Sequence, residues 1–357
     1  MSTPSSNASL ANPDASRKAS ASPAILWAVS LDGKGGAEDF INPEPDALAD
    51  HLAAANGETG PLWVHLHREW EGANAWLKSI KAPRTARRDL LAGDTRPDSV
   101  ALGDGVLVNL RGVNLNPGAE PEDMVALRLW VTPRLVVSAR ARPVKAVQDI
   151  RAQLKHGYGP LDAGGITGTL ALALADRMQP FLLELSDSIY DLDERDEILG
   201  NETPDGDRDL EEELHQARLD IVGLRRYLAP QQAALNRLHS SVHPVFTQAN
   251  RETLGIALNA HTRHLEDLDS LRDQAALLRD RIQQRAQERM NRAVYRMSLL
   301  AGVFLPLTFI TGLLGVNLGG IPGSASSWGF GVLCGLLVAL AGGEWLYLRR
   351  SDRFRDR

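Results

Sequence analysis

The chain has 357 residues, and 43% of them are hydrophobic, which is enough to build the cores of two or three domains. Its formal net charge of -6 gives no overall basic field, and we find no basic face outside the flanks of the C-terminal apolar segments, so we expect no nucleic-acid partner. The single cysteine, Cys334, excludes an intramolecular disulfide and any zinc site built from several cysteines.

Residues 1–23 are rich in Ser, Ala, Asn and Pro and contain no apolar run. This composition is typical of a disordered leader and not of a signal peptide. We therefore expect the N-terminus to stay in the cytoplasm.

Residues 24–160 have the mixed pattern of an α/β domain. Apolar residues alternate over 24–31 and 61–69, which predicts strands, whereas 47–56 and 73–80 have the spacing of helices. The domain should therefore combine a sheet with helices.

Two hairpins are predicted within this domain. The first turns at Asp104-Gly105 and the second at Thr132-Pro133-Arg134. The tripeptide Gly112-Val113-Asn114 ends the first hairpin, where a turn that closes the strand is its expected role.

Residues 161–296 are predicted to form long helices, because strand signals stop after Gly165 and the main interruption lies at 201–207. A helix from His261 to Leu314 would be roughly 80 Å long at ~1.5 Å per residue, too long for an ordinary globular helix. Apolar residues recur along it in steps of three and four, at Leu265, Leu268, Leu271, Ala275, Leu278, Ile282, Ala286, Met290, Val294 and Met297. The helix is therefore expected to leave the soluble domain.

Residues 297–348 are predicted to form a two-helix transmembrane hairpin. The first span, 297–314, has no ionisable residue and about the length of the hydrocarbon core, and the second covers 328–348. The alternative, a buried hairpin of a soluble protein, is disfavoured by the arginines outside both spans, which are Arg285, Arg289, Arg292, Arg296, Arg349, Arg350, Arg353, Arg355 and Arg357.

The arginines also predict the orientation of the hairpin. The connector between the spans carries no charge, so the positive-inside rule places it outside and both termini, including the basic tail 349–357, in the cytoplasm. Glu344 lies within the second span, where an acid is costly, and pairing with Arg349 near the interface is its expected role.

Two spans cannot enclose an aqueous path alone, so transport would require several copies in a closed ring. One face of the first span becomes smaller and more polar toward its outer end, as a pore lining would, although the same spacing also suits ordinary helix packing. This face comprises Val294, Met297, Ala301, Leu305, Thr308 and Gly312.

Asn317 is the distinctive residue directly beyond this span. Because Gly315 permits a tight turn, Asn317 can present its amide oxygen toward a central axis, and a ring of such oxygens suits a hydrated divalent cation. Helix capping is the alternative role for this asparagine.

Three motifs give the chain a resemblance to the CorA superfamily of two-span divalent-metal transporters. They are Tyr295-Arg296-Met297-Ser298, Phe304-Leu305-Pro306-Leu307-Thr308-Phe309 and Gly315-Val316-Asn317. Magnesium transporters of that superfamily usually carry Gly-Met-Asn, and Val316 followed by Leu318-Gly319-Gly320-Ile321-Pro322-Gly323 is similar to its zinc-transporting ZntB branch.

The resemblance implies a homopentamer in the inner membrane, with a cytoplasmic α/β/α funnel, a stalk helix continuous with the pore and the second span packed outside. It implies that Gly315, Val316 and Asn317 form the pore mouth and that the face from Val294 to Gly312 forms the pore line. It further implies that the transported ion is Zn2+ and that no resident cofactor is needed. Members of the branch are zinc exporters or proton-linked zinc importers, and of these we expect uptake linked to the proton gradient. Facilitated flux stays open, because the spans contain no evident proton-relay chain. Magnesium members often carry an acid in the outer loop, and this chain has none.

Zinc selectivity is not explained by the predicted pore line, which has neither His nor Cys. Secondary metal-site candidates lie elsewhere: Asp280, by its position in the resembling family, and His261 with His264, by their helical spacing. His65/His67 and His239/His243 also have spacings that suit metal binding, although packing or solvated placement is the favoured interpretation for every histidine pair.

The sequence has no phosphate-binding loop, metalloprotease motif or nucleophile motif, so we expect no enzymatic activity. Two other functions stay open. One is a CorA-like magnesium, cobalt or nickel channel, and the other is a membrane-anchored cytosolic metal-binding regulatory module that conducts nothing.

Overall fold

The computed structural model describes residues 25–41, 43–54, 60–119, 123–199, 204–315 and 327–352. Three sequence predictions lie outside these residues. They are the disordered leader 1–23, the outer connector with Val316 and Asn317, and the end of the basic tail from Arg353.

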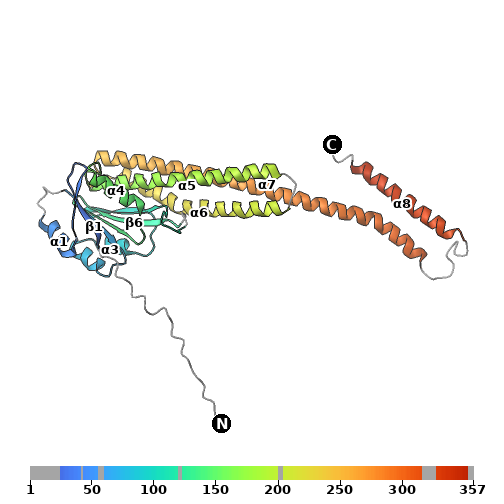
Figure 1. The fold of residues 1–357 in the computed structure, drawn as a ribbon, viewed down its shortest axis with the longest axis horizontal. Coiled ribbons are helices and arrows are strands. Elements are labelled where there is room, and N and C mark those ends of the chain that lie inside the picture. Colours follow the sequence, from blue (N-terminus) through green and yellow to red (C-terminus); the bar gives the residue numbers. More distant parts are fainter. Residues whose placement is uncertain are drawn as a thin grey trace, which may run out of the picture. The chain divides into compact units, whose positions relative to one another are not determined.

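The N-terminal region is built on a seven-stranded mixed sheet (Figure 1). In spatial order its strands are β2 (Ala37–Asp39), β1 (Ile25–Leu31), β3 (Leu62–His67), β7 (Leu135–Arg140), β6 (Val125–Val131), β5 (Gly105–Gly112) and β4 (Asp98–Leu102). Neighbours are antiparallel except β3 and β7, which run parallel from Leu62 beside Leu135 to His67 beside Arg140.

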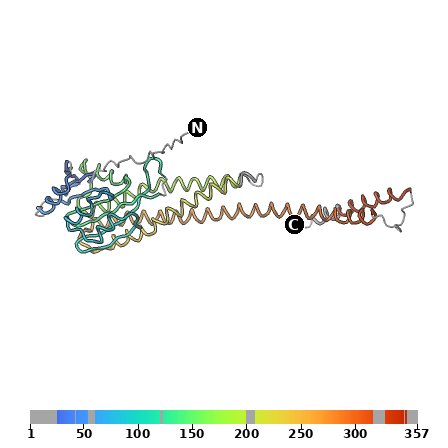
Figure 2. Tube along the Cα trace, turned by 90° about the horizontal axis from the view of Figure 1, so that it is seen from below, coloured from blue at the N-terminus to red at the C-terminus, as the bar shows by residue number. Residues whose placement is uncertain are grey.

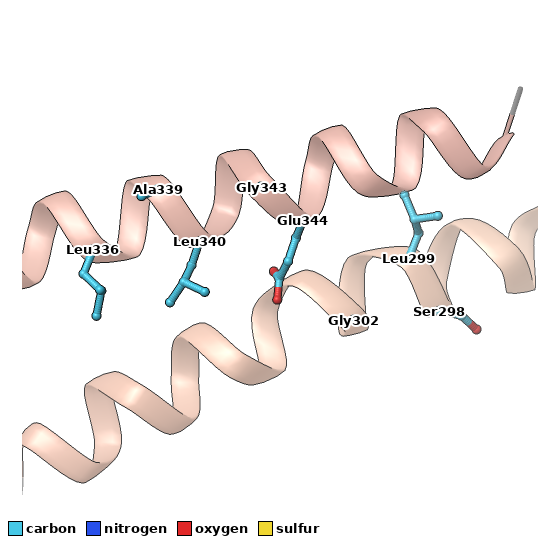
Figure 3. A pocket seen from close by; sticks show the side chains of 8 residues that line it. All are labelled: Ser298, Leu299, Gly302, Leu336, Ala339, Leu340, Gly343 and Glu344. Atoms are coloured by element: carbon cyan, nitrogen blue, oxygen red, sulfur yellow. The ribbon is translucent and has the colours of Figure 1, made fainter.

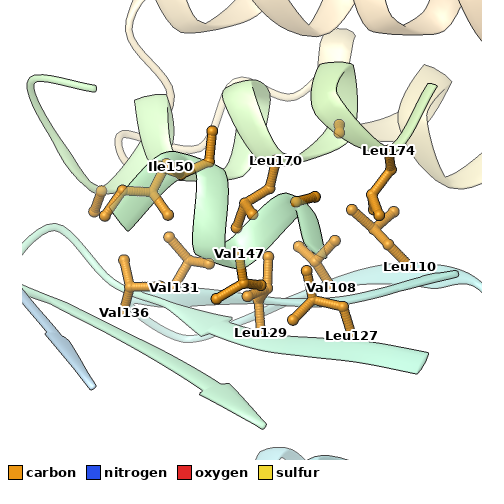
Figure 4. Close-up of a cluster of buried hydrophobic side chains, with 14 of the residues drawn as sticks. Val108, Leu110, Leu127, Leu129, Val131, Val136, Val147, Ile150, Leu170 and Leu174 are labelled. Atoms are coloured by element: carbon orange, nitrogen blue, oxygen red, sulfur yellow. The ribbon is translucent and has the colours of Figure 1, made fainter. Parts of the chain in front are cut away.

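Helices cover both faces of this sheet. One face packs against α1 (Pro45–Ala54), α2 (Ala73–Ser79) and α3 (Arg84–Leu91). The other packs against α4 (Lys145–Lys155) and the first turns of α5 (Ala163–Leu199), as the buried cluster in Figure 4 illustrates. The α/β/α layering expected from the sequence is therefore confirmed.

Period-two alternation explains how one strand serves both layers. On β6, Leu127 and Leu129 face the α4–α5 side of the sheet, whereas Trp130, the next residue along the strand, points to the opposite face and joins the cluster under α1, α2 and α3. On β5, Val106 and Leu107 are divided in the same way. Strands buried on both faces have nearly continuous apolar runs, and the burial of β3 and β5 is therefore more continuous than the simple alternation that predicted the strand at 61–69.

The two predicted hairpins are present, with one correction. β6 and β7 are joined through Thr132-Pro133-Arg134 as expected, but the turn between β4 and β5 lies at Gly103-Asp104, and Gly105 is already in β5 opposite Leu102. Gly103 has a φ of 65°, a conformation that glycine adopts without strain. The turn therefore uses Gly103 and not Gly105, which we had predicted.

The early Gly-Val-Asn copy closes a strand, as predicted. β5 ends at Gly112, and the Asn114 side-chain oxygen accepts hydrogen bonds from the backbone N–H of Asn116 (3.3 Å) and from its side-chain Nδ2 (2.7 Å). These are the bonds of a local turn, not of a binding site.

Three long helices follow the sheet, α5, α6 (Pro204–His239) and α7 (Gln248–Leu314). The predicted helix from His261 to Leu314 is confirmed, but it begins earlier, at Gln248, so that α7 has 67 residues and a length of roughly 100 Å. Figure 2 displays it as one continuous helix. The interruption predicted at 201–207 is shorter than expected, because α6 already begins at Pro204, a favourable first residue of a helix.

The chain divides into two compact units. The first contains the sheet, α5, α6 and α7 as far as Ala276, and the second contains α7 from Leu277 onward together with α8 (Gly329–Asp352). The predicted apolar face of α7 changes its environment a few residues beyond this boundary, after Ile282. Leu268, Leu278 and Ile282 are buried, whereas Met290 and Val294 are exposed in the single chain.

Candidate functional site

The last third of α7 carries the face that we predicted to line a pore. All of its members, Val294, Met297, Ala301, Leu305, Thr308 and Gly312, are exposed in the single chain. The Thr308 hydroxyl donates to the Phe304 carbonyl oxygen at 2.7 Å, so its proton is held by the helix and its oxygen remains an acceptor. The face therefore presents apolar side chains and one acceptor oxygen.

The neighbouring helix α8 faces a side of α7 other than the predicted pore face. A cavity of about 590 Å³ lies between the two helices and is lined by Ser298, Leu299 and Gly302 of α7 and by Leu336, Ala339, Leu340, Gly343 and Glu344 of α8 (Figure 3). At ~100° per residue, the side of α7 that lines this cavity lies about 100° around the helix from the predicted pore face. A Cβ atom added at Gly302 or Gly343 would meet nothing within 4 Å, so the two helices are not closely packed at these glycines. The predicted pore face is thus left free by α8.

Glu344 is directed from α8 toward α7 in this contact (Figure 3). Its Oε2 atom is buried and has no hydrogen-bond partner among the described residues. The predicted pairing with Arg349 stays a prediction, because the side chain of Arg349 lies outside the described part of the chain.

The helix ends at the residue that the sequence analysis singled out for a tight turn. α7 ends at Leu314, and the Gly315 N–H donates to the Thr311 carbonyl oxygen at 2.9 Å. A Cβ atom at Gly315 would lie 2.9 Å from that same oxygen, closer than such atoms approach in proteins, so any other residue here would require the backbone to shift. Gly315 therefore ends the helix immediately before Val316 and Asn317, both of which lie outside the described residues.

Helix α7 also has the properties of a membrane span. Among the described residues it is the one helix long and apolar enough to cross a bilayer, and no residue of its most apolar window is buried, unlike the core helix of a soluble protein. The apolar part of α8, Gly329–Glu344, is shorter than the second span that we predicted.

The two histidines of the pair on α7, His261 and His264, differ in their hydrogen bonding. His261 is buried, and its Nδ1–H donates to the Ala257 carbonyl oxygen at 3.0 Å, so its Nε2 must accept the N–H of Gln231 Nε2 at 2.6 Å. Both ring nitrogens are occupied, which leaves His261 no lone pair for a metal. His264 is also buried, but its Nδ1 has no hydrogen-bond partner among the described residues.

The strand histidines are structural. His65 is buried between Ser138, whose Oγ lies 2.7 Å from its Nδ1, and Arg140, whose Nε donates to its Nε2 at 3.0 Å. His67 Nε2 lies 3.0 Å from the Ala141 carbonyl oxygen. The packing interpretation therefore holds for this pair.

The remaining histidine pair does not share a helix. α6 ends at His239, so the helical spacing that suggested a pair with His243 is wrong. His239 Nδ1 contacts the Arg251 carbonyl oxygen at 2.8 Å and His243 Nε2 contacts that of Gly103 at 3.3 Å.

Asp280 is exposed and forms an ion pair with Arg279 at 2.6 Å. No group of three or more His, Cys, Asp or Glu residues is arranged to hold a metal within the residues that the structure describes. Any metal site in this part of the chain must therefore use fewer such ligands together with other oxygen donors.

Acid is expected to destabilise the N-terminal unit through its buried histidines. Burial lowers the pKa of His261 from 6.5 to about 4 and that of His65 to about 3, so both are neutral in the folded protein at neutral pH. Below the unfolded-state pKa the unfolded chain binds more protons, so the free energy of unfolding falls as the pH drops toward these folded-state values. Between about pH 7.5 and about pH 5.5, each histidine should contribute a loss of about 1.4 kcal/mol.

Urea unfolding of the detergent-solubilised chain at the two pH values measures this loss. His261→Gln should reduce the pH dependence by about half of the part that these two histidines supply, whereas replacement of the exposed His215 by glutamine should leave it unchanged. An unaltered pH dependence in His261→Gln would refute the assignment.

Comparison with known proteins identifies the fold and the family. The family model described as CorA-like Mg2+ transporter protein matches residues 58–350. The chain is 37% identical over 327 residues to the zinc transport protein ZntB of Yersinia enterocolitica, covering 91% of this chain and 95% of that protein. It is also 37% identical over 328 residues to the divalent cation transporter CmaX of Pseudomonas aeruginosa, covering 91% and 96%.

A solved structure of full-length CmaX superimposes with a TM-score of 0.76 at 36% sequence identity, covering 92% of this chain and 98% of that one. The α/β/α domain and the long helix are therefore those of a CorA-like protein, as the C-terminal motifs implied. With its sheet, its continuous α7 and a family match over most of its length, the chain belongs to the CorA-like Mg2+ transporter protein family.

Proposed function

We propose that this chain transports divalent metal cations across the inner membrane and that zinc is its physiological ion. The observation that carries the proposal is α7, whose last segment, 297–314, has no charged residue, contains no buried residue and ends directly before the Gly315 that begins the Gly-Val-Asn tripeptide. Zinc as the cargo is supported by similarity along nine-tenths of the chain to proteins named as zinc transporters. The family is one of ion transporters and not of enzymes.

The pore is assigned to the face from Val294 to Gly312, with Gly315, Val316 and Asn317 at its outer mouth. Transport through it requires a ring of copies, which we propose to be a homopentamer, because one face of a single helix cannot enclose water. The exposure of this face, which does not line the cavity between α7 and α8, supports the assignment. Asn317 would bind the hydration shell of the ion, since amide oxygens are ligands for hard, hydrated cations.

The membrane topology is proposed from charge. Residues 297–348 form the hairpin, the uncharged connector faces outward, and residues 24–160, 161–296 and the tail from Arg349 lie in the cytoplasm. Uptake linked to the proton gradient is the proposed energy source.

The ion selectivity has a second candidate besides zinc. The family description names Mg2+ and CmaX is named as a divalent cation transporter, so a channel for magnesium, cobalt or nickel is the second candidate. The purified chain in liposomes with an internal zinc dye should admit zinc in the presence of excess magnesium. Magnesium influx that zinc does not outcompete would favour the second candidate, and a metal-binding chain without any flux would favour an anchored regulatory module.

A further inference from the structure

A polar cavity lies between α5 and α7 in the N-terminal unit. Its volume is about 260 Å³. The lining is mostly polar and comprises Gln179, Leu182, Leu183, Ser186 and Tyr190 of α5 with His264, Asp267, Ser270, Leu271 and Gln274 of α7. Such a lining can hold a hydrated ligand, whereas an apolar cavity stays dry.

His264 is the unusual member of this lining. Its side chain is 5% exposed, and its Nδ1 is buried without a hydrogen-bond partner among the described residues. A buried polar atom without a partner costs about 1–3 kcal/mol of stability. A histidine at such a position therefore needs an explanation, such as a bound ligand. Rotation of the ring about the Cβ–Cγ bond exchanges Nδ1 and Cδ2 and can turn a lone pair toward the cavity without moving α7.

A carboxylate stands on the same helix face as this imidazole. Asp267 follows His264 by three residues, a spacing that places both side chains on one side of a helix and lets them share an ion. The two side chains form no direct ion pair within 4.0 Å, and Asp267 is exposed, so its oxygens are available. The hydroxyl of Tyr190 and the amide of Gln274 line the same cavity.

The electrostatic surroundings suit a cation. Burial lowers the pKa of His264, which keeps the imidazole in the neutral form that binds metals. The carboxylates of Asp267 and Asp176 raise that pKa, which shows that their negative field reaches the ring. One nearby cation, Arg263, lowers it. A divalent cation in the cavity would meet a neutral nitrogen ligand and a net negative field.

We propose that this cavity is a binding site for a borderline divalent cation of the zinc class, with His264 supplying the nitrogen ligand and Asp267 the carboxylate ligand. Water and the neutral oxygens of the lining complete the coordination, which makes the site open and exchangeable. Imidazole favours zinc, cobalt or nickel over magnesium, so this site discriminates between metals in a way that the predicted pore line, without His or Cys, does not. His261 takes no part, because its two ring nitrogens are already bonded.

The test measures Zn2+ bound per full-length chain in detergent by calorimetry, with Co2+ absorption as a probe of imidazole coordination. His264→Gln should lose one bound Zn2+ per chain and the corresponding Co2+ spectrum, and the exposed Asp267→Asn should weaken that binding about tenfold. One variant serves as a control and should keep the site: His215→Gln, which removes an exposed histidine of α6.

Unchanged Zn2+ stoichiometry and affinity in both His264→Gln and Asp267→Asn would overturn the site, and so would Mg2+ competing as effectively as Co2+. Circular dichroism tests whether each variant is folded. If His264→Gln does not fold, Asp267→Asn still tests the site, because Asp267 is exposed. Zinc flux by the unaltered protein is measured separately. A chain that binds Zn2+ at His264 but conducts no metal would retain the site and refute the transport proposal.

Discussion

Asn317→Ala is expected to lower zinc flux about tenfold or more. One hydrogen bond from the amide of a copy to the ion's hydration shell contributes ~1.4 kcal/mol, and this free energy corresponds to a tenfold change. Removing the amide from every copy in a ring removes all of these acceptors at once. The measurement is zinc uptake into proteoliposomes at matched protein content. Magnesium uptake in the same vesicles reports whether selectivity changes together with rate.

The chain contains its own control for this substitution. Asn114 occupies the same position in the other Gly-Val-Asn tripeptide, but its oxygen accepts bonds from Asn116 in a buried turn. Asn114→Ala should therefore cost about 1–2 kcal/mol of stability and leave flux per folded chain unchanged. Equal flux and selectivity in Asn317→Ala and the unaltered protein would remove Asn317 from the pore mouth.

Gln231→Ala is expected to destabilise the N-terminal unit by about 3–5 kcal/mol, since it leaves three buried polar groups without their partner. Gln231 Oε1 accepts the Arg111 N–H at 2.6 Å, and its Nε2 donates to the Arg111 carbonyl oxygen at 3.1 Å and to His261 Nε2 at 2.6 Å. The side chain is 1% exposed, so water cannot replace it. It joins the end of β5 to α6 and α7 at one point.

The neighbouring Gln232 is a matched control. It is half-buried and donates to Thr262 Oγ1 at 2.9 Å, a bond that water can replace. Gln232→Ala should cost about 1 kcal/mol or less in urea unfolding of the detergent-solubilised chain. Similar losses in the two variants would show that the buried bonds of Gln231 are not what holds the three elements together.

Much of the fold was predictable because its signals are local. The hairpin turn at Thr132-Pro133-Arg134 and the three-and-four spacing along α7 each arise from residues close together in the sequence, so the sequence revealed them directly. The turn before β5 was misplaced by one residue, because Gly103 and Gly105 flank Asp104 symmetrically in the sequence and only the register with Leu102 distinguishes them.

The candidate site was less predictable, because it depends on contacts between distant residues. Spacing alone grouped His261 with His264, and it could not reveal that Gln231, thirty residues earlier, occupies the second nitrogen of His261. The cavity beside His264 needs α5 as well as α7. Likewise, the spacing of His239 and His243 suggested one helix, but α6 ends at the first of them.

Zinc movement through the chain is the central property to be tested. The most direct measurement follows zinc influx and internal pH together in proteoliposomes of the purified protein, with and without an inward proton gradient. We expect zinc influx above that of protein-free vesicles, resistant to excess magnesium and faster when the gradient is present. Zinc influx no greater than in protein-free vesicles under either condition would contradict the account.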